Sequence, residues 1–230
     1  MPSYAVILVK PKYPGNVGAA ARAMLNFGIR ELIVVAPSFS LNSDACRTMA
    51  VHAQSVLDNA LIVDTFEEAA KQVAYLAGTS AIETTSEKRH LRRALSLPTF
   101  GKHVAAIEGR VGLAFGREDY GLLNEEIRRC DALIHIPTAA TYPAMNLSHA
   151  VSVTLYVLTA ERGEEIATRR ADRNEKELLY DNFDLLLKGI NYPEHKKEKT
   201  SILFRRLIGR AMLSKWEYHT LMGVFKRARR

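Results

Sequence analysis

The sequence predicts an α/β fold: a mostly parallel sheet with helices on both faces, followed by a small basic helical domain. Over residues 1–161, short apolar runs rich in Val and Ile alternate with helical patterns, which is typical of parallel sheets covered on both faces. Residues 162–176 are charged and lack apolar periodicity, so we expect a linker there. Residues 177–230 carry only helical patterns, which predicts a separate helical domain.

The first predicted strand covers residues 4–9, where YAVILV is apolar on both faces. The segment KPKYPG breaks this pattern, after which Asn16 can cap a helix over residues 17–27 and Gly28 can end it. The same reasoning predicts strands at residues 31–35, 61–63 and 73–77, and helices at residues 43–57 and 66–72.

The second half of the sheet domain is expected to add strands at residues 112–115 and 133–136, with a short helix between them. A helix over residues 146–161 is apolar on most sides, so we expect it to be largely buried, partly against another subunit. Beyond the linker, Ser214 and Glu217 have the spacing of a capping box. The predicted helices of the tail cover residues 175–188, 201–212 and 215–227.

Length and composition exclude several classes of protein. At 230 residues and 47% hydrophobic content the chain can bury a full core, so disorder is not expected as its main state. No apolar run reaches the roughly 18–20 residues that a membrane helix needs, and no segment resembles a signal peptide, which predicts a cytoplasmic protein that does not contact membranes. Cys46 and Cys130 lack the spacing of metal ligands or of a disulfide framework. We therefore expect no metal, and we interpret both cysteines as small buried residues.

The net charge of +7 is concentrated at the C-terminal end. Residues 196–230 contain 11 Lys and Arg against 2 Asp and Glu, a local charge of +9, which leaves −2 for the rest of the chain. A nearly neutral body with a basic tail suits a polyanionic partner such as RNA, although a solvated basic surface would have the same composition. Residues 83–98 include Lys88, Arg89, His90, Arg92 and Arg93 and are either a substrate loop or a charged surface connection.

Two segments near predicted strand ends have the residue types of a ligand site. In NVGAAAR, Asn16 and Gly18 lie at a helix start, where free backbone N–H groups favour a phosphate, and Arg22 follows about one turn later. A plain helix cap with a packing glycine and a surface arginine is the alternative. In FGREDYGL, Gly116 lets the chain turn sharply and approach a ligand closely, and Glu118 can accept N–H groups or a ligand hydroxyl. The glycine fingerprints of dinucleotide and P-loop sites do not occur, which argues against redox and phosphotransfer enzymes.

Together with AGTSA at residues 77–81 and IPTAATYPAMNLSHA at residues 136–150, these segments resemble the motifs of the SPOUT-class RNA methyltransferases. The resemblance covers nearly the whole chain, including ILFRRLIGRAML in the tail, and it is specific for the branch that methylates ribose in the tRNA anticodon loop. It implies a C-terminal trefoil knot in the α/β domain, a homodimer, and S-adenosylmethionine bound among three loops. The cofactor-binding residues that it implies are Thr79, Ser80, Ala81, Gly116, Glu118, Ile136, Pro143, Ala144, Met145 and Asn146.

The resemblance also implies the residues of the reaction. Asn16, Arg22 and Tyr142 are the expected catalytic residues, the substrate is tRNA, and the target is the ribose 2′-hydroxyl of nucleotide 32. We expect Arg22 of one protomer to face the cofactor of the other and to grip the phosphate beside that ribose. Its assignment as a general base would need a neutral guanidinium, which is rare. Relatives often have Ser where this chain has Ala144, so the backbone or Tyr142 would have to supply that contact. The expected RNA-binding residues are Arg89, Arg92, Arg93, Arg205, Arg206 and Arg210.

Two other functions stay open at the level of sequence. Ribose methylation of ribosomal RNA would need the same site and would differ only in the tail. A non-catalytic RNA-binding protein would need only the basic surface, and the cofactor residues would then have no role. Binding of S-adenosylmethionine separates this last interpretation from the other two.

Overall fold

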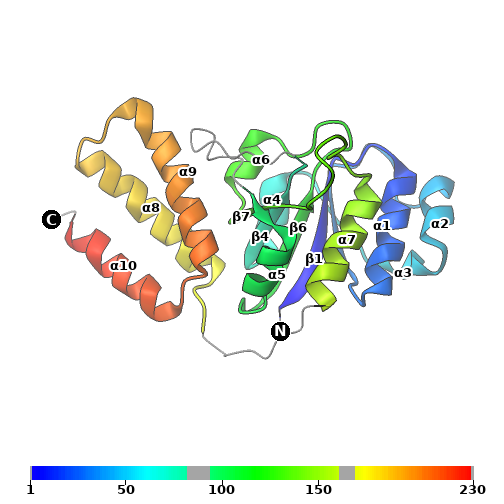
Figure 1. The fold of residues 1–230 in the computed structure, drawn as a ribbon, viewed down its shortest axis with the longest axis horizontal. Helices are drawn as coiled ribbons and strands as arrows, with labels where there is room; N and C mark the ends of the chain where they lie inside the picture. Colours follow the sequence, from blue (N-terminus) through cyan, green and yellow to red (C-terminus); the bar gives the residue numbers. More distant parts are fainter. Residues whose placement is uncertain (1, 82–93, 161–168, 229–230) are drawn as a thin grey trace.

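The computed structural model describes residues 2–81, 94–160 and 169–228. At its centre lies a seven-stranded sheet in the order β3–β2–β1–β6–β4–β7–β5, in which every pair of neighbouring strands is parallel (Figure 1). The expected parallel α/β sheet is thereby confirmed. The strands are β1 (Ser3–Val9), β2 (Glu31–Val35), β3 (Leu61–Val63), β4 (Tyr75–Thr79), β5 (Leu95–Ser96), β6 (Arg110–Phe115) and β7 (Ala132–His135).

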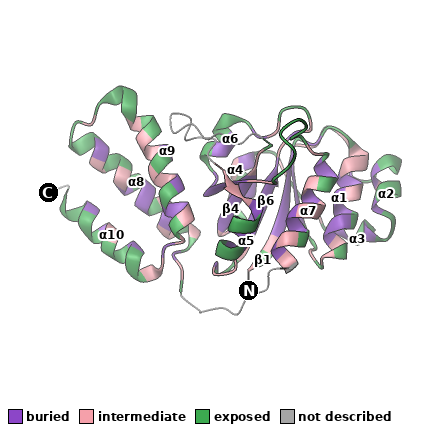
Figure 2. Cartoon of the chain, viewed as in Figure 1, coloured by how far each residue is buried: buried purple, intermediate pink, exposed green. Residues whose placement is uncertain are grey.

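Helices cover both faces of the sheet because each central strand is apolar on both sides. In β1, Val6 and Leu8 belong to the core of one face, and Ile7 belongs to the core of the other. The first face is covered by α1 (Pro14–Asn26), α5 (Leu97–Val104) and α7 (Leu147–Ala160), and the second by α4 (Phe66–Lys71) and α6 (Asn124–Arg128). The central strands of the sheet, such as β1 and β6, are accordingly buried (Figure 2).

Several element boundaries differ from the sequence prediction. Helix α1 begins at Pro14, because the fixed φ of proline suits the first turn of a helix, so Asn16 lies inside that turn and is not its cap. The expected helix at residues 43–57 is interrupted at Val51, whose φ is +53°. It is divided into α2 (Asp44–Ala50), the 3₁₀ turn η1 (Val51–Ala53) and α3 (Gln54–Asp58).

The segment expected at residues 83–98 falls partly on β5 and α5, which the sequence prediction missed. Ser96 caps α5 by accepting a hydrogen bond from the Thr99 N–H at 3.4 Å, and a proline lies in the first turn. Residues 82–93, with Arg89, Arg92 and Arg93, lie outside the described residues. The trefoil knot stays a prediction.

The expected helical tail is present as α8 (Arg173–Gly189), α9 (Glu194–Ala211) and α10 (Lys215–Arg227). Its own core includes Leu179, Ile208 and Met222, and the rings of Phe183 and Phe204 stack with centroids 3.9 Å apart. The predicted capping box of α10 is confirmed, since the Ser214 hydroxyl accepts from the Glu217 N–H and Glu217 accepts from the Ser214 N–H. Helix α8 begins within the expected linker, at Arg173, and residues 161–168 lie outside the described residues, so the domain boundaries stay a proposal.

The tail lies beside the sheet domain (Figure 1) and packs against it next to β7, through a buried charged cluster around Asp131. Asp131 is fully buried and accepts hydrogen bonds from the Leu76 N–H at 2.8 Å and from Arg173 at 3.1 Å, while Lys176 lies 3.7 Å away. Gly209 of α9 has no side chain at the contact, where a Cβ would lie 2.0 Å from the Asp131 carbonyl oxygen. Close packing and buried ion pairs therefore hold the tail in one position on the body.

Both cysteines are buried and free, as the sequence predicted. Burial raises the pKa of the Cys130 thiol to about 12, so this thiol stays protonated and unreactive near neutral pH.

Candidate active site

A cavity of about 310 Å³ opens at the carboxyl ends of β4, β6 and β7, the edge at which parallel sheets bind ligands. Its size lies within the range of about 300–1,000 Å³ that is typical of small-molecule sites. Three segments far apart in the sequence form its walls. They include nine of the ten predicted cofactor residues: Thr79, Ser80, Ala81, Gly116, Glu118, Ile136, Pro143, Ala144 and Met145.

The tenth residue, Asn146, belongs to a hydrogen-bond chain that joins the three motifs beside this cavity. The Asn146 amide donates to the Asn16 side-chain oxygen at 3.0 Å, and the Asn16 amide donates to Glu118 at 2.9 Å. Glu118 also accepts from the backbone N–H groups of Lys12 and Tyr13, at 2.9 and 3.3 Å. Glu118 therefore satisfies N–H groups at the start of α1. Through Asn16 it is connected to Asn146, so these hydrogen bonds fix two of the three cavity walls relative to each other.

The loop at residues 116–121, which we call the 116–121 loop, closes tightly on itself. Arg117 and Gly121 exchange two backbone hydrogen bonds, at 3.2 and 2.8 Å, and Gly121 has a φ of +72°. A Cβ on Gly116 would lie 2.0 Å from the Gly121 carbonyl carbon and 2.2 Å from the Leu122 nitrogen. Gly116 is thus required by the approach of the loop's own backbone, and the loop presents backbone to the cavity.

A buried ion pair that sequence reasoning missed anchors the 116–121 loop to α6. Arg117 donates two hydrogen bonds to the Glu126 carboxylate, at 2.9 and 3.0 Å, and the two residues are 8% and 7% exposed. Glu126 also accepts from the Leu123 N–H at 2.7 Å. The position of Glu126 in the first turn of a short helix was the available sequence signal, although its partner could not be read from it.

The two motif residues Gly18 and Arg22 of α1 have different surroundings: Gly18 is buried and Arg22 is exposed. Gly18 is buried against α2, where a Cβ would lie 2.0 Å from the Cys46 carbonyl oxygen, so its role is close helix packing and not phosphate binding. Arg22 is exposed and does not line the cavity of its own chain. It lies six positions after Asn16, about 9 Å along the helix axis. The structure therefore does not bring Arg22 and the cofactor residues together within one chain.

Tyr142 also lies apart from the cavity. Its side chain is 79% exposed, and its backbone N–H donates to the Ala139 carbonyl at 3.0 Å. Ala144 lines the cavity with a methyl group where relatives often have a hydroxyl. The Tyr142 hydroxyl does not substitute for that hydroxyl within the described chain.

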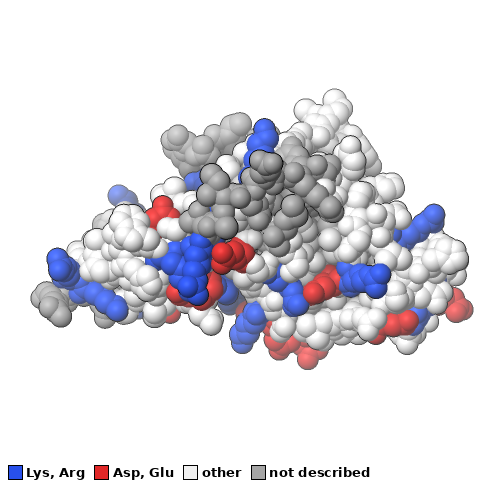
Figure 3. Space-filling view, turned by 90° about the horizontal axis from the view of Figure 1, so that it is seen from below, with Lys and Arg blue, Asp and Glu red and all other residues white. Residues whose placement is uncertain are grey.

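The basic tail is less free to bind RNA than its composition suggested. Arg206 is 4% exposed and donates to the Ile127 carbonyl at 2.9 Å, which corrects the expectation that it contacts RNA. Arg205 forms a two-bond pair with Glu177, at 3.0 and 2.8 Å, and Arg210 is half-buried. On the face seen in Figure 3, basic residues are interspersed with acidic ones. Part of the positive charge of the tail is therefore paired with groups of the chain itself and stabilises the fold.

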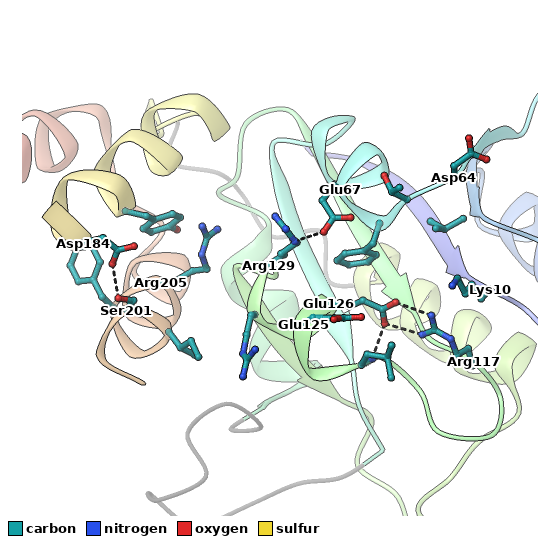
Figure 4. A pocket seen from close by; sticks show the side chains of 18 of the residues that line it. Lys10, Asp64, Glu67, Arg117, Glu125, Glu126, Arg129, Asp184, Ser201 and Arg205 are labelled. Atoms are coloured by element: carbon teal, nitrogen blue, oxygen red, sulfur yellow. Dashed lines mark hydrogen bonds and ion pairs between the residues drawn. The ribbon is translucent and has the colours of Figure 1, made fainter. Parts of the chain in front are cut away.

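A larger cavity of about 600 Å³ lies between the body and the tail (Figure 4). Its charged walls are balanced, with five cations and five anions, so it does not favour a polyanion. Several of these groups are already paired, such as Arg117 with Glu126 and Arg129 with Glu67. The charged lining residues are Lys10, Arg117, Arg128, Arg129 and Arg205, and Asp64, Glu67, Glu125, Glu126 and Asp184. The smaller cavity, which the motif residues line, is the candidate active site.

Comparison with known proteins agrees with this choice. The sequence profile described as the SpoU rRNA Methylase family matches residues 3–156, which include all three cavity walls. The chain belongs to the SpoU methylase family. Membership accounts for the parallel sheet and for the meeting of the three motifs at one edge of it.

Relatives of this family extend the similarity to the tail. The tRNA (cytidine-2'-O-)-methyltransferase TrmJ of Methanocaldococcus jannaschii is 44% identical over 227 residues, 96% of this chain and 97% of that protein. The tRNA (cytidine/uridine/adenosine-2'-O-)-methyltransferase TrmJ of Pseudomonas aeruginosa is 36% identical, over 95% of this chain and 91% of that protein. The crystal structure of TrmJ from Z. mobilis ZM4 superposes over the full length of both chains, with a TM-score of 0.75 and 27% identity. The helical tail is thus shared with these relatives.

Among residues 2–81, 94–160 and 169–228, no three His, Cys, Asp or Glu side chains gather where they would hold a metal ion. Within the same residues, every helix is too short or too polar to cross a bilayer.

Proposed function

We propose that this member of the SpoU methylase family transfers a methyl group from S-adenosylmethionine to the 2′-hydroxyl of a ribose in the anticodon loop of tRNA. The observation that carries the proposal is the meeting of three distant segments around one cavity, two of which the Asn146–Asn16–Glu118 hydrogen bonds connect. The names of the two TrmJ relatives describe both as tRNA 2'-O-methyltransferases, which supports the substrate class.

The cavity fits this cofactor in its chemistry. Ile136, Leu147 and Ala150 offer apolar surface to an adenine ring, and the backbone of residues 79–81 and 116–121 offers N–H and C=O groups. The Thr79 hydroxyl already donates to the Ala114 carbonyl at 3.0 Å, so the ligand would be held mainly by backbone. When bound, S-adenosylmethionine supplies a methyl group on a sulfonium, which an oxygen nucleophile can attack in line. The chain contributes by holding the cavity walls, excluding water and orienting the RNA.

The target nucleotide is a finer proposal. We infer nucleotide 32 from the resemblance described above, and the activities of the relatives differ in whether cytidine alone or several bases are accepted. Mass spectrometry of tRNA methylated by the pure protein with isotope-labelled methyl donor would locate the label. Label on another tRNA nucleotide would overturn position 32. With total RNA as the substrate, label on ribosomal RNA alone would support the second enzyme function. A protein that does not bind S-adenosylmethionine in calorimetry would be a non-catalytic RNA-binding protein.

Arg22 is proposed to grip the phosphate beside the target ribose and to stabilise the developing alkoxide. Replacing Arg22 by alanine should lower kcat/KM by about 10²–10³-fold, in the range found for removing one transition-state hydrogen-bond donor. Arg22→Lys should recover only part of this loss, because an ammonium cannot bind a phosphate through two parallel hydrogen bonds. Steady-state methylation with labelled donor measures both, and a fully active lysine variant would rule out the two-bond grip.

A homodimer would place Arg22 at the cavity of the partner. Tyr156 of α7 is 62% exposed and Tyr13 before α1 is 50% exposed, which suits a contact through the elements that carry Asn16 and Asn146. Arg22→Ala and Gly116→Ala subunits, each impaired about a hundredfold or more alone, should then regain about a quarter of wild-type activity when mixed and refolded together, because half of the dimers are mixed and each has one intact site. Mixed subunits that stay inactive would show that the site is completed within one chain. Within the cell we propose that the protein acts in the cytoplasm, where tRNA is the available substrate.

A further inference from the structure

Helix α6 lies between the cavity and the tail and makes buried contacts with both. On one side, Glu126 of its first turn holds Arg117 of the 116–121 loop through two hydrogen bonds. On the other, the Ile127 carbonyl accepts a hydrogen bond at 2.9 Å from Arg206 of α9. Adjacent residues of one short helix thus contact the cavity loop and the tail, and both contacts are removed from solvent.

These contacts can transmit a displacement of the tail to the 116–121 loop. A guanidinium bound to a carboxylate through two parallel hydrogen bonds fixes orientation as well as distance. Arg117 directly follows Gly116, and its backbone closes the loop by two hydrogen bonds with Gly121, so displacement of Glu126 would move the cavity wall. Arg206 lies outside the cavity lining, and its guanidinium meets a carbonyl near the end of α6, where a cation is favourable.

We propose that the docked tail positions the cofactor loop through α6, so that Arg117, Glu126 and Arg206 are positioning residues for S-adenosylmethionine binding. The inference rests on the proposed function for the identity of the ligand. It assigns the tail a role in cofactor affinity that is separate from any contact with RNA.

The contacts between α6 and its surroundings also provide matched controls. Glu198 of α9 pairs with Arg128 of α6 at 2.9 Å, but these side chains are 67% and 44% exposed. Glu67 pairs with Arg129 at 2.6 Å and is likewise exposed to solvent, at 44%. Surface ion pairs of this kind contribute little to stability. Removing them changes the charge around α6 and leaves its buried contacts in place.

Calorimetry with S-adenosylmethionine and no RNA tests the proposal on the full chain. Glu126→Gln should raise the Kd at least about tenfold, since Arg117 is left buried without its anionic partner. Arg206→Met should raise it about threefold or more, although Arg206 does not line the cavity. Glu198→Gln and Glu67→Gln should leave it unchanged. The double variant Arg117→Gln with Glu126→Gln should raise the Kd no more than either single change does, because the two residues act as one unit.

Two results would overturn the proposal. In the first, the Glu126→Gln or Arg206→Met variant folds with reduced thermal stability and still binds S-adenosylmethionine as tightly as the wild type. The other would come from hydrogen exchange of the wild-type protein, in which we expect the cofactor to slow exchange at residues 116–121, at 124–128 and at 202–210 of the tail. Protection confined to residues 116–121 would refute the coupling between the tail and the loop, even if the variants did not fold. A wild-type protein that does not bind the cofactor would refute the proposed function as well, so the two failures are distinguishable.

Discussion

Replacing Asp131 by asparagine should lower the free energy of unfolding at pH 7 by about 3–5 kcal/mol, the cost of breaking a buried ion pair from one side. Asp131 is fully buried, and the change would leave Arg173 and Lys176 facing a neutral amide. Urea denaturation measures the loss. The exposed pair of Arg110 and Glu31 supplies the control, because Glu31→Gln should cost no more than about 1 kcal/mol.

The cost of the Asp131→Asn change should also depend on pH. Burial alone would raise the pKa of Asp131, but Lys176, Arg173 and the Leu76 N–H outweigh it and hold the pKa below its ordinary value. A carboxyl whose pKa is lowered by folding stabilises the protein above its unfolded pKa, about 3.9, and loses that contribution as the pH falls through the folded value. The difference between wild type and variant should therefore be constant from pH 7 to about pH 5 and shrink at lower pH. A difference that grew under acid conditions would contradict this account.

Replacing Gly116 by alanine should weaken S-adenosylmethionine binding roughly a hundredfold, equivalent to about 2.7 kcal/mol. The added Cβ would lie 2.0 Å from the backbone of Gly121, and backbone cannot move aside as a flexible side chain can. The 116–121 loop would have to open, and with it the cavity wall. Calorimetry measures the affinity, and circular dichroism shows whether the sheet is retained.

A glycine in open space provides the comparison for this change. Among the described residues, and apart from the neighbouring turns of its own helix, no atom lies within 4 Å of the position of a Cβ on Gly223 in α10. Gly223→Ala should therefore bind the cofactor normally and should stabilise its helix slightly. Equal affinities of the Gly116→Ala and Gly223→Ala variants would show that the 116–121 loop does not form the cofactor site.

The sheet and its motifs could be predicted because they depend on local patterns. A strand apolar on both faces, such as β1, must lie between two layers of helices, and alternating strands and helices then favour a parallel sheet. The carboxyl ends of parallel strands meet at one edge, so Thr79, Gly116 and Ile136 could be expected near one another. Resemblance to a family identified which of these residues to group.

Periodicity was enough to predict the layered α/β core and the helical tail, because it records which side of each element is buried. The set of residues around the cavity came from the resemblance to a family. The partners of individual polar groups became evident only in the folded chain. Asn16 was expected to cap a helix and instead joins Glu118 to Asn146. Arg206 was expected to bind RNA and instead holds α6. A charged side chain looks the same in a sequence whether it faces solvent or a buried carbonyl, and the choice depends on segments more than 70 residues away along the chain.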